Sequence, residues 1–218
     1  MLNYKLVIFD WDGTLVDSTG RIVDSMQRAA REVQLPVIPD AAVQNIIGLG
    51  LPEALETLWP GIAGEQMAVM TKAYARFFVT DSQVGMGFFP GAVDFLEGLL
   101  KQERLLAVAT GKSRKGLDRM LRDLQVGHLF ATTRCADETR SKPHPLMLEQ
   151  ILAELSVAPH EALMIGDTTY DLDMANAAGV ASVAMGHGAH NEAQLLACRP
   201  LAVCHSMREL NEWVQQNG

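Results

Sequence analysis

Short apolar runs recur along the chain, and each is followed by a turn and then by a helical pattern. Six such runs are present, at residues 6–9, 105–109, 129–133, 162–165, 181–185 and 201–204. Continuous apolar runs of this length are typical of strands that are buried on both faces of a sheet. Strands that alternate with helices predict right-handed βαβ units and a parallel sheet. We therefore expect an α/β fold with a Rossmann-like, three-layer parallel sheet.

The helices between these runs have recognisable start and stop signals. We expect helices to begin near Ala92, near Arg114, at Pro143 and near Tyr170. The last of these is expected to end at Gly179, because glycine readily adopts the backbone conformation that terminates a helix.

The alternation is interrupted once, directly after the first strand. From Val16 to about Val84 the sequence shows no convincing strand, and it predicts four helices, at 18–34, 40–47, 52–58 and 65–80. An insert of this length is far longer than an ordinary βα loop. It follows the carboxyl end of a strand, where open α/β sheets bind ligands, so it is placed to act as a lid. We expect a core domain at 1–15 and 85–218 and a helical cap domain at 16–84.

Composition narrows the classes of partner. The net charge of −8 argues against nucleic acid or an anionic membrane as the default partner. The three cysteines include no CxxC pair, which fits a reducing compartment. No apolar stretch approaches the roughly 20 residues that span a bilayer, and the first apolar run is too short for a signal peptide. We expect a cytoplasmic protein.

The strongest candidate for chemistry is the segment that follows the first run, Asp10-Trp11-Asp12-Gly13-Thr14. A carboxylate can attack phosphorus and form an aspartyl-phosphate. A second carboxyl group nearby can act as an acid toward the leaving oxygen. A calcium-binding loop does not fit, because Gly13 comes too early and Arg21 stands where the bidentate Glu should be.

Two further segments could bind a phosphoryl group at the same sheet edge. Thr110 and Gly111 follow the second run, where a hydroxyl and free backbone N–H groups can bind phosphoryl oxygens. A helix N-cap is an equally good interpretation of Thr110, and a nucleotide-binding loop is excluded because Leu106 replaces its first glycine. Lys142 could neutralise phosphate charge, although an isolated lysine is more often a solvated surface residue.

The fourth segment, Gly166 to Asp171, ends one strand and opens a helix. Magnesium is usually held by one or two carboxylates together with phosphate and water, and Asp167 with Asp10 supplies that number. Asp171 could orient these ligands from behind. The alternative for Asp171 is an acidic residue that the helix dipole favours at a helix N-terminus.

Together these segments resemble the phosphatase branch of the haloacid dehalogenase superfamily. The resemblance rests on D-x-D-G-T at Asp10–Thr14, the hydroxyl at Thr110, Lys142 before a proline and G-D-x-x-x-D at Gly166–Asp171. It also includes the order and spacing of the strands, so it covers essentially the whole chain. It implies a strand order of the 3-2-1-4-5-6 type, and the insert resembles the small helical cap of phosphoglycolate-phosphatase-like members.

The resemblance also implies a role for each residue. Asp10 would be the nucleophile, and Asp12 the general acid and then the base. Thr110 and the N–H of Gly111 would hold the phosphoryl group, and Lys142 would pair with it and with Asp10. The implied cofactor is Mg²⁺, and its expected ligands are Asp10, Asp167 and the backbone carbonyl of Asp12, with Asp171 in support.

The leading hypothesis is therefore a phosphatase that acts on a small phosphorylated metabolite, as a monomer or homodimer. A phosphomutase of the β-phosphoglucomutase type remains an alternative, because it keeps both aspartates. A non-enzymatic switch that carries a phosphorylated aspartate is a third. The cap and Asp12 both favour turnover over a switch.

Overall fold

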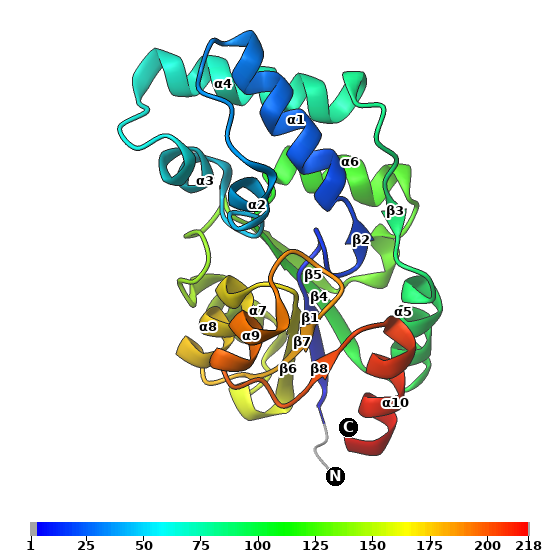
Figure 1. Ribbon diagram of the computed structural model, residues 1–218. Coiled ribbons are helices and arrows are strands. Elements are labelled where there is room, and N and C mark those ends of the chain that lie inside the picture. Colours follow the sequence, from blue (N-terminus) through cyan, green and yellow to red (C-terminus); the bar gives the residue numbers. More distant parts are fainter. Residues whose placement is uncertain (1–3, 218) are drawn as a thin grey trace.

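The computed structural model describes residues 4–217 and contains a parallel six-stranded sheet in the order β5-β4-β1-β6-β7-β8 (Figure 1). The strands are β1 (Leu6–Phe9), β4 (Leu105–Thr110), β5 (Thr132–Cys135), β6 (Ala162–Gly166), β7 (Ala181–Met185) and β8 (Val203–Cys204). Counted within this sheet alone, the order is 3-2-1-4-5-6, which confirms the fold expected from the sequence.

Strand β1 lies at the centre and is level with both neighbours at its carboxyl end. Phe9 is in register with Val108 of β4 and with Ile165 of β6. The residues that follow these three strands therefore emerge side by side at one edge of the sheet.

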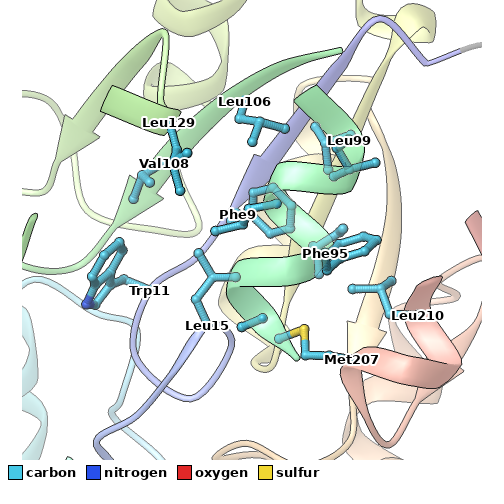
Figure 2. Close-up of a cluster of buried hydrophobic side chains, with 14 of the residues drawn as sticks. Phe9, Trp11, Leu15, Phe95, Leu99, Leu106, Val108, Leu129, Met207 and Leu210 are labelled. Atoms are coloured by element: carbon cyan, nitrogen blue, oxygen red, sulfur yellow. The ribbon is translucent and has the colours of Figure 1, made fainter. Parts of the chain in front are cut away.

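Helices cover both faces of the sheet. On one face lie α5 (Ala92–Lys101), α6 (Arg114–Asp123) and α10 (Met207–Asn217); on the other lie α7 (Leu146–Leu155) and α8 (Thr169–Ala177), with the short α9 (Glu192–Ala197) beside the latter. Phe9 and Phe95 meet edge to face within the first of these layers (Figure 2). Within residues 4–217, none of the helices has both the length and the apolar character that a bilayer span requires.

The insert forms a helical layer above the carboxyl edge of the sheet (Figure 1). It consists of α1 (Thr19–Glu32), α2 (Asp40–Gln44), α3 (Leu51–Leu58) and α4 (Gly64–Arg76), and a π-helical turn (Phe77–Asp81) extends the last of these. The insert has its own hydrophobic cluster, in which Met26, Leu55 and Met70 are fully or almost fully buried. Each of its helices overlaps one of the four that the sequence predicts.

Three local expectations were wrong. A short strand, β2 (Val16–Asp17), lies within 16–84, where no strand was expected, and it pairs antiparallel with β3 (Gly87–Phe88), just after the insert. The third run does not start a strand at Leu129, because 127–129 forms a 3-10 turn. Helix α7 does not begin at Pro143; a turn comes first, and the helix starts after Pro145.

Candidate active site

A buried lysine lies between two buried aspartates at the carboxyl edge of the sheet. The Nζ atom of Lys142 is 2.7 Å from Oδ1 of Asp10 and 2.6 Å from Oδ1 of Asp171. Asp10 directly follows β1, Lys142 lies in the turn before α7, and Asp171 is in the first turn of α8. All three side chains are essentially inaccessible to solvent. Lys142 is therefore buried, and the alternative interpretation of its sequence position, a solvated surface lysine, is wrong.

Asp171 also accepts hydrogen bonds from Thr168, at 3.1 Å from the backbone N–H and 2.7 Å from the hydroxyl. Asp171 thus fits both interpretations of the sequence, an acidic residue at a helix N-terminus and a support for the neighbouring site residues. It caps the start of α8, and its other oxygen holds Lys142 in place.

Asp167 follows β6 and lies beside this group. The Thr14 hydroxyl donates to its Oδ1 at 2.6 Å, and the backbone N–H of Ala189 donates to its Oδ2 at 2.7 Å. One carboxylate oxygen from each of Asp10, Asp167 and Asp171 lies within 4.8 Å of the others. The sequence contains Thr14 within the first motif but indicates no role for it, whereas the structure shows that it orients Asp167.

The three acids fit a hard divalent cation. Such ions prefer oxygen ligands, chiefly carboxylates. Oδ2 of Asp10 is buried and makes no hydrogen bond to any residue that the structure describes. A buried carboxylate oxygen without a partner is costly, and a bound cation would satisfy it.

Burial dominates the electrostatics of the cluster. It raises the pKa of Asp10 well above its usual value, and the neighbouring acids raise it further while Lys142 opposes them. Burial and the charge of Asp171 raise the pKa of Asp167 to about 7, against the hydrogen bonds from Thr14 and Ala189. Burial would lower the pKa of Lys142, but Asp10 and Asp171 more than compensate and raise it, so the ammonium keeps its charge.

Asp12 lies apart from this cluster and has partners of its own. The Ser18 hydroxyl donates to its Oδ1 at 2.5 Å, and Nζ of Lys112 is 2.9 Å from its Oδ2. The same Nζ lies 4.7 Å from the ring centre of Phe78 in the insert. Lys112 therefore connects Asp12 to the helical layer above it.

Sequence reasoning missed both Lys112 and Ser18. The position of Lys112 directly after Gly111, in the same turn, was the available signal. Nothing in the sequence around Ser18 distinguishes it from an ordinary helix-capping serine.

Thr110 is the last residue of β4, and Gly111 opens the turn that follows it. The Thr110 hydroxyl is buried and accepts a hydrogen bond from the Lys112 N–H at 3.2 Å. Ser113, not Thr110, caps helix α6, since its hydroxyl accepts from the Gly116 N–H. The N-cap alternative for Thr110 is thus excluded. A Cβ atom on residue 111 would collide with backbone carbonyl groups of residues 48 and 49, so only glycine lets the insert approach this turn.

The structure thus places all seven residues that the sequence singles out at one edge of the sheet: Asp10, Asp12, Thr110, Gly111, Lys142, Asp167 and Asp171. Residues 7–185 match the family model described as "Haloacid dehalogenase-like hydrolase". The chain belongs to this family.

Curated relatives of this hydrolase carry phosphatase names. "Probable phosphatase IndB" of Dickeya dadantii is 33% identical over 94% of this chain and 91% of that protein. A phosphoglycolate phosphatase of Rhodospirillum rubrum is 31% identical over 96% of this chain and 90% of its own length. A hydrolase from Pseudomonas syringae, 23% identical, superposes with a TM-score of 0.88 over 97% of this chain and 98% of its own. This last comparison shows the fold alone.

A cavity of about 360 Å³ separates the acidic cluster from the insert of the hydrolase. Asp10, Asp12 and Thr110 lie on its floor, which the sheet edge forms. Most of its remaining lining comes from the insert. Its size is in the range of pockets that take small molecules.

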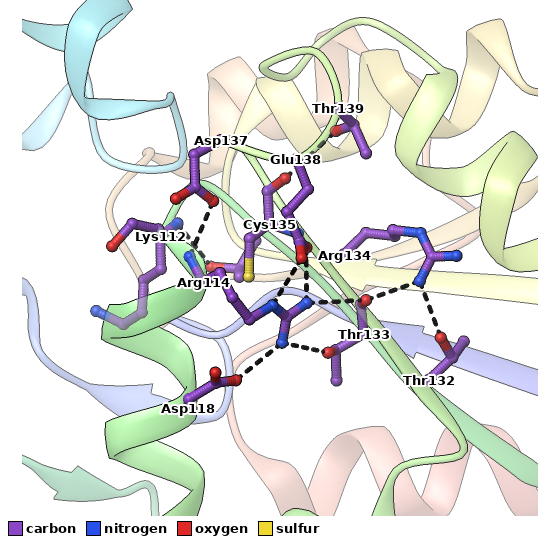
Figure 3. A network of polar contacts seen from close by, with 12 residues as sticks. Lys112, Arg114, Asp118, Thr132, Thr133, Arg134, Cys135, Asp137, Glu138 and Thr139 are labelled. Carbon is purple, nitrogen blue, oxygen red and sulfur yellow. Dashed lines mark hydrogen bonds and ion pairs between the residues drawn. The ribbon is translucent and has the colours of Figure 1, made fainter.

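A polar network beside the floor fixes the start of α6 (Figure 3). The Arg114 guanidinium donates to Glu138 at 2.7 Å and to the Thr133 carbonyl at 3.1 Å, and the Arg114 N–H donates to Asp137 at 2.9 Å. The hydrogen bonds that Glu138 accepts from Arg114 lower the pKa of the Glu138 carboxyl group. The network joins α6 to β5 and so holds the turn at 110–113 in position.

Proposed function

We propose that this hydrolase is a Mg²⁺-dependent phosphatase that cleaves a small phosphomonoester through an aspartyl-phosphate on Asp10. The observation that carries the proposal is the Asp10 carboxylate itself. It is buried at the floor of a cavity, one oxygen pairs with Lys142, and the other has no partner among residues 4–217.

The residues would divide the work as follows. A carboxylate oxygen of Asp10 attacks phosphorus, and the bond from phosphorus to the ester oxygen breaks. Asp12 gives a proton to that departing oxygen and later takes one from the water that attacks the phospho-aspartate, which frees inorganic phosphate. Thr110 and the Gly111 N–H hold the phosphoryl oxygens, and Lys142 balances their charge.

The proposed ligands of Mg²⁺ are the carboxylates of Asp10 and Asp167 and the backbone carbonyl of Asp12, with Asp171 behind them. Bound there, the ion would neutralise charge on the phosphoryl oxygens. Support comes from the oxygen-only donor set and from three buried carboxylates, of which two, Asp10 and Asp171, share one ammonium group.

We place the proposed activity in the cytoplasm, in a monomer or homodimer with a core at 1–15 and 85–218 and a cap at 16–84. The separate hydrophobic cluster of the insert supports this division. Phosphoglycolate is named for several relatives, which supports a small phosphorylated metabolite as the substrate class.

The test is Mg²⁺-dependent release of phosphate from p-nitrophenyl phosphate by the wild type and by Asp10→Asn. The variant is expected to lose more than about 10³-fold in kcat/KM, because an amide is a poor nucleophile. Asp94→Asn, on the exposed side of α5, is the matched control and should retain activity. Normal turnover in Asp10→Asn would refute the proposal. A phospho-enzyme that isomerises a sugar phosphate would favour the mutase, and one that persists for minutes without turnover would favour the switch.

A further inference from the structure

The roof of the cavity is apolar. The insert contributes fourteen residues to the lining, and the only polar side chains among them are the hydroxyl groups of Thr71 and Tyr74. The most buried of the apolar ones are Ile22, Met26, Ile46, Ile47, Ala54 and Phe78. A leaving group that is bound to the phosphoryl on the floor would therefore lie against hydrocarbon.

The cationic side chains of the insert do not line the cavity. There are five of them: Arg21, Arg28, Arg31, Lys72 and Arg76. Arg21 donates to the Val84 carbonyl at 2.7 Å, and Arg28 donates to the Asp81 carbonyl at 2.6 Å.

The remaining three cations of the insert also lie elsewhere. Arg76 pairs with Glu32 and Asp81 on the outside of the layer. Arg31 and Lys72 are exposed. No positive charge of the insert is thus available to an acidic leaving group.

The core supplies two cations to the lining, and neither belongs to the roof. Lys112 is already paired with Asp12. Arg119 lines the cavity from α6, six residues after Ser113, which is about 9 Å along the helix axis. A carboxylate on a leaving group that lies against the roof would lose water and meet no cation of the insert, which is costly.

We propose, on the basis of the phosphatase function above, that the substrate is the phosphomonoester of an uncharged and mostly apolar alcohol or phenol. In this hydrolysis the ester and water give the free alcohol and inorganic phosphate. An apolar cavity of roughly 150 Å³ holds a benzene molecule. The 360 Å³ found here has room for one ring or a branched alkyl chain beside the phosphoryl group. Thr71 and Tyr74 can serve one or two hydroxyl groups on it.

The inference separates this chain from its relatives that are named phosphoglycolate phosphatases. The decisive comparison is isobutyl phosphate against phosphoglycolate. The two leaving groups have the same number of non-hydrogen atoms and the same branching, and both depart as primary alkoxides, but two methyl groups replace the carboxylate oxygens. We expect kcat/KM for isobutyl phosphate to be higher by at least about 100-fold. Benzyl phosphate should be a better substrate still.

Leu51 offers a variant that tests the cause. It lines the cavity from the first residue of α3 and is only half buried, so a longer side chain can be accommodated there. Leu51→Arg would place a cation on the roof, and it should shift the preference toward phosphoglycolate by about tenfold or more. Leu51→Met, which keeps the apolar surface, is the matched control and should leave the ratio unchanged.

The outcomes distinguish the inference from the proposed function. Asp10-dependent hydrolysis with equal or better use of phosphoglycolate would overturn the inference and leave the phosphatase standing. An unchanged substrate ratio in folded Leu51→Arg would also overturn it. If no ester releases phosphate in an Asp10-dependent way, the proposed function fails and the inference fails with it.

Discussion

The floor and the roof of the cavity are built on opposite principles. On the floor, one oxygen from each of three buried carboxylates lies within 4.8 Å of the others, and a buried ammonium pairs with two of them. On the roof, two hydroxyl groups are the only polar side chains. The floor holds charges that must be paired, whereas the roof presents hydrocarbon that requires no partner.

This difference separates chemistry from selectivity. Buried charges are stable only when others hold them, so each residue on the floor is fixed by its neighbours and offers little freedom for change. The roof is constrained by shape and volume alone, so its residues can vary while the reaction stays the same. The three predictions that follow test this contrast, from the largest expected effect to the smallest.

Lys142 is the residue on which the floor most depends. Lys142→Met keeps the length of the side chain but leaves Asp10 and Asp171 without their shared partner. In Mg²⁺-free buffer at pH 8 we expect a loss of about 3–5 kcal/mol in the free energy of unfolding. We also expect a loss of more than about 10³-fold in kcat/KM with Mg²⁺ present. Urea unfolding and phosphate release measure the two effects.

Arg140→Met is the matched control for this prediction, because Arg140 is exposed two residues earlier. It should change the free energy of unfolding by less than about 0.5 kcal/mol. If Lys142→Met unfolds like this control, the ion pairs of the floor are not stabilising and the contrast with the roof is lost.

The sequence predicts some residues of the floor better than others, because different features of the chain bring them to the site. Asp10, Asp167 and Thr110 follow buried strands, and parallel strands bring their carboxyl ends to one edge, so periodicity alone brings these residues together. Lys142 and Asp171 follow from the motif resemblance, not from any local pattern. Only tertiary structure shows that they touch.

Other features could not be predicted because they depend on packing between distant segments. Strands β2 and β3 have two residues each, too few to show a period, and they pair across the whole insert. Strand β5 begins at Thr132 and not at Leu129, where the apolar run begins. Its polar residues can form a strand because β5 lies at the edge of the sheet, while the apolar residues before it form a turn. Lys112 has a role only because the insert brings Phe78 above it.

Lys112 joins the floor to the roof and is expected to have an intermediate effect. Lys112→Met removes both the ion pair with Asp12 and the contact with the Phe78 ring. We expect kcat for an alkyl phosphate to fall about 10–100-fold, which is less than the roughly 10²–10⁴-fold of a whole general-acid contribution, because Asp12 itself remains. With p-nitrophenyl phosphate the fall should be smaller, because p-nitrophenolate leaves without a proton.

Lys115→Met is the control for Lys112, since it changes an exposed lysine three residues later, in the first turn of α6. It should leave both substrates unaffected. An equal loss with the alkyl and the aryl ester in Lys112→Met would show that Lys112 does not act through Asp12.

The smallest effect is the pH dependence of Mg²⁺ binding, which the roof should not influence. Burial raises the pKa of Asp167 to about 7, so below that pH the folded protein holds a proton that the unfolded chain releases above about pH 4. Stability without metal therefore falls as the pH rises between these values. Because Mg²⁺ binds the ionised carboxylate, its apparent affinity should be about tenfold weaker at pH 6 than at pH 8.

The measurement is the shift in melting temperature caused by a fixed, subsaturating concentration of Mg²⁺ at each pH. The shift should be larger at pH 8 than at pH 6, and Asp167→Asn should remove most of both the shift and its pH dependence. Leu51→Met, on the roof, should reproduce the wild-type shifts at both pH values. Equal shifts for the wild type at pH 6 and pH 8 would mean that the acids of the floor are already ionised without the metal. The raised pKa of Asp167 would then be refuted, whereas the absence of a shift at both pH values would refute the cation site itself.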